Sequence, residues 1–232
     1  MAAAARTSRR VLLDVRNSLQ YVDLIRKKSH SILQQCGQRI HNPQWKERYR
    51  VHPRAFVRDR KLSFARMIAL FVRRHCRSIQ ADLESMWQSW SKTLGSSPLV
   101  SKQAFCQRRM QIQAEVFEAL NQELVQDFYS DEELELWHGY RLCAVDGSLL
   151  QLSCSEESQA YYGGSPNGTY PMGKVSIVYD VLNGLTLDAL LVPYAEQDER
   201  ALAKQHLERL AHEARTIHPS VWLLDRGYPS FA

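Results

Sequence analysis

The spacing of the apolar residues changes between residues 131 and 141, and this change limits the chain to a fold built from two different parts. From Ser63 onwards the apolar positions recur at helical intervals, beginning with Phe64, Ile68 and Phe71. The helical period continues to about residue 130. The sequence therefore predicts a helical region ahead of the change.

Beyond residue 141 the apolar runs are short and typical of strands. The pair Asn183-Gly184 between two such runs is the strongest short signal for a β-hairpin. The sequence predicts, in order, a strand at 142–152, two strands within 174–193, a helix at 198–215 and a buried strand at 221–224. We therefore expect an α+β protein with a helical N-terminal region.

The segment before Ser63 is strongly basic. Residues 9–36 show a helical pattern, whereas residues 41–61 carry two prolines and many charges, which indicates an irregular connector. Residues 1–80 contain 19 Lys and Arg against 4 Asp and Glu, while residues 81–232 contain 11 against 21. This asymmetry is typical of a basic part that meets a polyanion, although a solvated basic helix face without a partner has the same composition.

Two of the apolar runs lead into an aspartate. Asp146 stands in "LCAVDGS" and Asp225 in "VWLLDRG", and the neighbouring Gly147 and Gly227 permit a tight turn or the close approach of a phosphate. A carboxylate in or just after a buried strand is costly unless it is paired, hydrogen-bonded or bound to a metal. Each aspartate taken alone is equally typical of a turn.

The two aspartates together favour a metal site. If the first and last strands are neighbours, their backbones lie about 4.8 Å apart, and both carboxylates reach one divalent cation. Hard oxygen ligands of this kind suit Mg²⁺, which usually keeps several waters and binds substrate phosphates. The metal hypothesis therefore depends on the pairing of two strands that are far apart in the sequence.

The stretch "LVSKQAFCQRRMQI" at 99–112 predicts a helix that is capped by Ser101. Its polar side chains are of types that contact phosphates and base edges in DNA. A helical scaffold with a basic outer face is the alternative. The candidate DNA-binding residues are Lys102, Gln103, Gln107, Arg108 and Arg109.

Other reactive residue types give weaker signals. The histidines at 138, 206, 212 and 218 show no ligand spacing, and we expect them at the surface. The five cysteines are scattered without a C-x-x-C pair, which is typical of reduced thiols in a cytosolic protein. No apolar run is long enough to cross a bilayer.

Several of these segments resemble a known family when they are taken in order. "AVDGS" and "LLDRGYPSF", joined by "KVSIVYDVLNGLTLDALLVP" and "DERALAKQHL", resemble the catalytic domain of DDE transposases of the insertion-sequence-4 family. The upstream "LSFARMIALFVRRHCRSIQADLESMW" and "VSKQAFCQRRMQIQAEVFEALNQEL" resemble the helical N-terminal region of that family. The resemblance covers about residues 60–232 and implies a ribonuclease-H-like mixed sheet that is incomplete at its C-terminal end.

The resemblance also implies a chemistry. Asp146 and Asp225 would be the first and second catalytic acids and would bind two Mg²⁺ ions about 3.5–4 Å apart, which hold the scissile phosphate of DNA. The third acid of the family is a Glu on a later helix, and the chain ends at Ala232 before any such motif. We therefore expect a truncated transposase from a bacterial mobile element that is inactive alone.

The expected organisation is a basic arm at 1–60, a helical DNA-binding region at 61–130 and a truncated catalytic domain at 131–232. The complete protein would act in the cytoplasm on transposon ends and target DNA, as a homodimer in a synaptic complex. Two other hypotheses stay open. One is a non-catalytic DNA-binding protein, such as a truncated transposase that acts as a repressor, and the other is an unrelated Mg²⁺-dependent nuclease.

Overall fold

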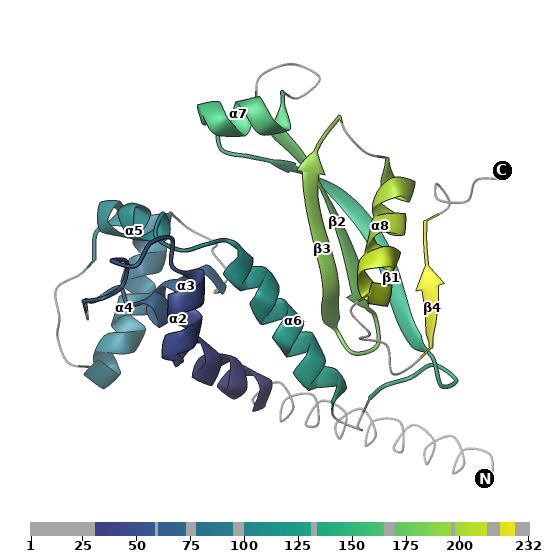
Figure 1. The fold of residues 1–232 in the computed structure, drawn as a ribbon, viewed down its shortest axis with the longest axis horizontal. Helices are drawn as coiled ribbons and strands as arrows, with labels where there is room; N and C mark the ends of the chain where they lie inside the picture. Colours follow the sequence, from purple (N-terminus) through teal and green to yellow (C-terminus); the bar gives the residue numbers. More distant parts are fainter. Residues whose placement is uncertain are drawn as a thin grey trace, which may run out of the picture. The chain divides into compact units, whose positions relative to one another are not determined.

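The chain forms two compact units, Met1–Leu120 and Asn121–Ala232. Helices make up the first unit, and a four-stranded mixed sheet with further helices makes up the second (Figure 1). The expected α+β class is therefore confirmed. The computed structural model describes residues 31–58, 60–72, 78–94, 100–130, 134–164, 170–195, 198–212 and 219–225.

The helices ahead of the sheet follow the predicted period. Residues 31–41 are helical, and Ser101 caps the predicted helix because its hydroxyl oxygen accepts a hydrogen bond from the backbone N–H of Ala104 at 3.2 Å. The bounds of the others are α2 (Pro43–Tyr49), α3 (Phe64–Val72), α4 (Ile79–Leu94), α5 (Lys102–Arg109) and α6 (Glu115–Tyr129). The division between the two units falls inside α6.

The expectation of an irregular connector over 41–61 is partly wrong, because α2 lies within it. Pro43 occupies the first turn of α2, where its missing N–H has no helical partner to lose, and the side chain of Asn42 caps that turn at 2.9 Å from the N–H of Gln44. Pro43 therefore begins a helix, whereas Pro53 lies in a turn. The remainder, from Arg50 to Lys61, has no regular secondary structure in its described residues.

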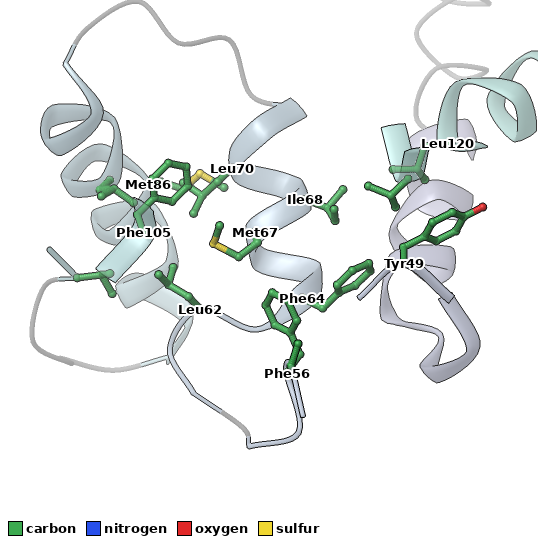
Figure 2. Close-up of a cluster of buried hydrophobic side chains, with 14 residues drawn as sticks. Tyr49, Phe56, Leu62, Phe64, Met67, Ile68, Leu70, Met86, Phe105 and Leu120 are labelled. Carbon is green, nitrogen blue, oxygen red and sulfur yellow. The ribbon is translucent and has the colours of Figure 1, made fainter. Parts of the chain in front are cut away.

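The core of the first unit is centred on α3. Met67, Ile68 and Leu70 are almost completely buried, and Phe56 and Leu62 pack beside them from the irregular segment (Figure 2). Burial of side chains of this size stabilises a fold by roughly 1.5–3 kcal/mol each. The segment that carries many of the basic residues is therefore held to the helices by its own apolar side chains.

The sheet has the strand order β3-β2-β1-β4. The pairs β1–β2 and β2–β3 are antiparallel, and β4 is parallel to β1. Gly184, with φ of +68°, lies in the predicted hairpin turn between β2 and β3. The elements of this unit are β1 (Arg141–Gln151), α7 (Glu156–Tyr162), β2 (Met172–Asp180), β3 (Leu185–Pro193), α8 (Glu199–His212) and β4 (Ser220–Leu223).

One face of the sheet carries the second core. Cys143, Val145 and Val178 are buried there together with Ala203 and Leu210 of α8, and α8 lies along the sheet in Figure 1. A register shift at Val178/Tyr179 coincides with burial of both Leu187 and Asp188, although they are consecutive in β3.

The last strand differs from the expected buried strand. β4 is an edge strand in which Trp222 is half-buried, whereas Leu223 and Leu224 are 44% and 46% exposed. Asp146 also does not end its strand, because β1 continues to Gln151. Among the described residues, no helix is both long and apolar enough to cross a membrane.

Candidate metal site and DNA-contacting residues

Asp146 lies within β1, and Asp225 follows β4, the parallel neighbour of β1. In the register of β1 and β4, Cys143 lies opposite Trp222 and Ala144 lies opposite Leu223. This is the last pair, because β4 ends at Leu223, and Asp146 and Asp225 each stand two residues beyond it in the sequence. Neighbouring strand backbones are about 4.8 Å apart, and opposite residues of parallel strands direct their side chains to the same face. The pairing of the first and last strands, on which the metal hypothesis depends, is present in this fold.

Asp146 lies on the open face of the sheet. Val145 is buried on the α8 side, and Asp146 as the next residue is exposed on the other side, because side chains alternate along a strand. Its Oδ1 accepts a hydrogen bond from the N–H of Gly147 at 2.8 Å. Ile177, directly opposite on β2, is also exposed. Asp225 is exposed as well, so both carboxylates are accessible to a ligand from solvent.

A buried polar network supports the sheet from its other face. His206 of α8 is completely buried, with Nδ1 2.8 Å from Asp188 Oδ2 and Nε2 3.0 Å from Ser176 Oγ. Arg209 Nε lies 3.2 Å from the same Asp188 oxygen. The expectation that His206 is a surface residue is therefore wrong. Its spacing along α8 gave no sign of this, because its partners come from β2 and β3.

This network has the residue types of a hydrolase triad but not the access that a triad needs. Ser176 is only 2% exposed, so a substrate has no path to its hydroxyl. Ser176 lies directly opposite Gly147 across the β1–β2 pair. The network therefore joins α8 to the part of the sheet that carries Asp146, and its role is to hold that part in place.

Within the described part of the chain, no three His, Cys, Asp or Glu side chains gather as a ligand set. Glu199, at the start of α8, comes within 4.0 Å of the position that a Cβ on Gly147 would occupy. Because Gly147 and Asp146 alternate across β1, Glu199 approaches the face opposite to Asp146. It is therefore not placed as a third ligand beside the two aspartates.

The candidate DNA-binding residues lie on α5 but do not share one environment. Lys102, Gln103, Gln107 and Arg109 are exposed, whereas Arg108 is half-buried and stacks on Phe56. Gln107 and Arg108 border one groove, and Arg109 borders a separate, mainly apolar cavity of about 180 Å³ beside Asp82. The helix thus presents these side chains in two directions.

Comparison with known proteins adds one likeness. A protein of Escherichia coli (strain K12) with the name "Putative transposase InsZ" is 27% identical over 125 residues. The matched part is 51% of this chain and 42% of that protein, so the chain spans less than half of that relative's length. No family profile matches the chain. No solved structure matches it either.

Proposed function

We propose that this chain carries two of the metal-binding acids of a DNA transposase, Asp146 and Asp225. The observation that carries the proposal is the parallel register of β1 and β4, in which the residues two positions beyond Ala144 and Leu223 are both aspartates. The likeness to a relative named as a transposase supports the same reaction class.

The donor set fits Mg²⁺. Mg²⁺ in phosphoryl-transfer sites is usually held by one or two carboxylates, while waters and substrate phosphates complete its coordination. Two exposed carboxylates, one in β1 and one two residues after the end of β4, meet that requirement. When bound, such ions activate a water or a DNA 3′-hydroxyl and stabilise the leaving oxygen. The role of this chain would be to hold the two carboxylates close together at one edge of the sheet.

The ribonuclease-H-like assignment belongs to the proposal. The sequence resemblance implies three antiparallel strands, then a helix, and then a fourth strand parallel to the first. The sheet and α8 follow this order. In that architecture Asp146 lies in the first strand and Asp225 just after the fourth. The third acid of the family and the homodimeric synaptic complex remain expectations from the same resemblance.

The test is Mn²⁺ binding, followed by electron paramagnetic resonance, with and without a short DNA duplex. Because phosphate oxygens complete the coordination, the duplex is expected to tighten Mn²⁺ binding by the wild-type chain. Asp146→Asn and Asp225→Asn are each expected to lose this effect while still binding the duplex. Glu156→Gln removes an exposed acid from α7 and serves as the control, with wild-type behaviour expected.

Two results would overturn the proposal. Mn²⁺ affinity that is equal in the wild type and in both aspartate variants would remove these residues from a metal site. Duplex binding without any aspartate-dependent uptake of Mn²⁺ would favour a non-catalytic DNA-binding protein.

A further inference from the structure

A basic groove lies inside the unit Met1–Leu120, between the irregular segment 54–62 and α5. Two adjoining cavities of about 620 Å³ and about 400 Å³ form it, and they share Arg60, Arg108 and Gln111. No acidic side chain stands among the described residues that line it. The cationic side chains of the basic groove are Arg54, Arg58, Arg60, Lys61 and Arg108.

Arg108 is fixed at the centre of this groove by three contacts. Its Nε donates a hydrogen bond to the carbonyl oxygen of Leu62 at 3.1 Å, and its Nη1 donates to Gln111 Oε1 at 2.9 Å. The guanidinium carbon lies 4.1 Å from the centre of the Phe56 ring. The remaining nitrogen, Nη2, is buried and has no hydrogen-bond partner among the described residues.

A buried donor without a partner is costly, by about 1–3 kcal/mol and by more for a charged group. The environment of Arg108 adds to this cost, because burial and then the positive charge of Arg60 lower the pKa of Arg108 from its ordinary value. An anion in the groove would reduce the repulsion between the guanidinium groups of Arg60 and Arg108. The arrangement therefore has the properties of an anion site.

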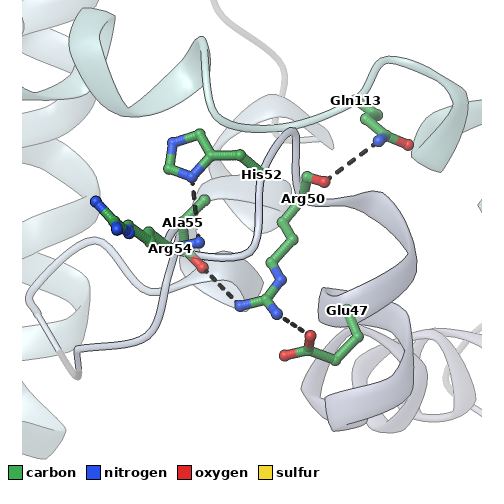
Figure 3. A network of polar contacts seen from close by, with 6 residues as sticks. All are labelled: Glu47, Arg50, His52, Arg54, Ala55 and Gln113. Atoms are coloured by element: carbon green, nitrogen blue, oxygen red, sulfur yellow. Dashed lines mark hydrogen bonds and ion pairs between the residues drawn. The ribbon is translucent and has the colours of Figure 1, made fainter.

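The backbone beside the groove is held by a different arginine. The carbonyl oxygen of Arg50 accepts a hydrogen bond from Gln113 Nε2 at 3.2 Å. The side chain of Arg50 donates through Nη1 to the carbonyl oxygen of Ala55 at 3.3 Å. Figure 3 shows that Glu47 pairs with this guanidinium, whereas the side chain of Arg54 extends away from it. Arg50 thus acts as a structural tie, and Arg54 lines the groove.

We propose that the basic groove binds the phosphate backbone of DNA through its five cationic side chains. The proposal rests on the proposed function, because DNA is the polyanion that such a chain would meet. Five cations along two joined cavities exceed what one inorganic phosphate needs, and they suit a ligand with repeated charges. The contact would then be made by the described residues of 54–58 and 60–62 together with Gln107 and Arg108 of α5.

The experiment measures fluorescence anisotropy of a labelled DNA duplex with the full chain over a range of salt concentrations. Arg60→Gln and Arg58→Gln are each expected to weaken binding several-fold and to reduce the slope of log affinity against log salt by about 1. Lys204→Gln removes a charge that is 79% exposed on α8, and it is expected to leave affinity and slope unchanged.

Arg108→Gln is expected to have the largest effect, but it also breaks contacts within the protein. Its circular dichroism spectrum and thermal midpoint are therefore compared with the wild type, and Arg60→Gln keeps the test valid if this variant does not fold. Wild-type affinity and slope in both Arg60→Gln and Arg58→Gln would overturn the proposal.

A second arm distinguishes DNA from free phosphate, with inorganic phosphate added at constant ionic strength. Phosphate binding that depends on Arg60, combined with duplex binding that does not, would assign the groove to a small anion and overturn the proposal. Uptake of Mn²⁺ by Asp146 and Asp225 is expected to persist in the Arg60→Gln variant. The experiment therefore tests the groove proposal and the metal-site proposal independently.

Discussion

Ala144 of β1 lies directly opposite Leu223 of β4 in a parallel pair. Two residues further along each segment comes an aspartate, Asp146 after Ala144 and Asp225 after Leu223. Each is the first carboxylate after the apolar run of its segment. Parallel neighbours in register place opposite side chains on the same face. Strand pairing between segments far apart in the sequence thus makes a two-carboxylate site possible, and the buried network around His206 anchors the opposite face.

The buried network predicts a large loss of stability when His206 is truncated. His206→Ala removes the partner of both Asp188 and Ser176 in a fully buried position, so the free energy of unfolding is expected to fall by about 3 kcal/mol. Leu207→Ala, at the next position of α8 and 44% exposed, is the control, with a change of about 0.5 kcal/mol or less expected. Urea denaturation followed by circular dichroism gives both values. Equal effects would show that the network contributes little.

The environment of Tyr129 predicts that the stability of the fold decreases at alkaline pH. Its hydroxyl donates to the buried Asp180, and burial followed by that carboxylate raises the pKa of Tyr129 above the ordinary tyrosine value. The neutral form is therefore favoured in the folded state. The contribution of this group to stability is fully present below about pH 10, the ordinary pKa, and is lost as the pH rises above it.

The measurement for Tyr129 is absorbance at alkaline pH. Tyr129→Phe is expected to leave the titration of the folded chain near pH 10 unchanged and to remove one tyrosine from the titration in denaturant. Loss of a tyrosine from the folded titration would contradict the raised pKa. The same variant is expected to lower the free energy of unfolding at neutral pH by roughly 1.5–3 kcal/mol, since the hydrogen bond is made to a carboxylate.

The cysteines predict a difference in labelling. Cys143 is completely buried, and burial is the main cause of the raised pKa of its thiol, whereas Cys154 is exposed. At pH 8 a thiol-reactive alkylating agent is expected to modify Cys154 in the folded chain and Cys143 only in denaturant. Peptide mass spectrometry locates the label, and Cys154→Ser is the matched control. Equally rapid modification of both thiols would show that the sheet core is open.

The hairpin turn predicts a contrast between two glycines. Gly184 has φ of +68°, so Gly184→Ala is expected to lower the free energy of unfolding by about 1–2 kcal/mol. Gly147 is extended, and a Cβ there would lie 3.4 Å from the carbonyl oxygen of Val175, an ordinary contact. Gly147→Ala is therefore expected to keep or slightly raise stability. A larger loss for Gly147→Ala than for Gly184→Ala, measured by thermal denaturation, would contradict this account.

The order of most elements could be predicted because each signal is local, and the exceptions are α2 and α7. The period of α3, the Ser101 cap and the Asn183-Gly184 turn depend on residues close together in the chain. The reading of 41–61 was wrong where a proline can also begin a helix, as Pro43 does. Exposure of β4 was missed because an apolar run does not tell whether a strand lies at the edge of a sheet.

The candidate sites show the same limit. Asp146 and Asp225 could be named from the sequence, since each follows an apolar run, but the pairing of β1 with β4 could not. The burial of His206 depends on partners in β2 and β3, and the groove around Arg108 depends on a segment about 50 residues earlier. Nothing in the spacing of these residues announces such contacts. The basic residues of the segment 54–61 can be recognised in the sequence. Only the structure shows that they line a groove with α5.

The convergence of the two aspartates is tested most directly by iron-directed cleavage of the protein backbone. Fe²⁺ bound in place of Mg²⁺, with ascorbate and peroxide, generates radicals that cut the chain close to the metal ligands. The account predicts two cuts, one near Asp146 and one near Asp225, and predicts that Asp146→Asn removes both. A cut near Asp225 that persists in Asp146→Asn, or a cut at one position alone in the wild type, would contradict a shared site.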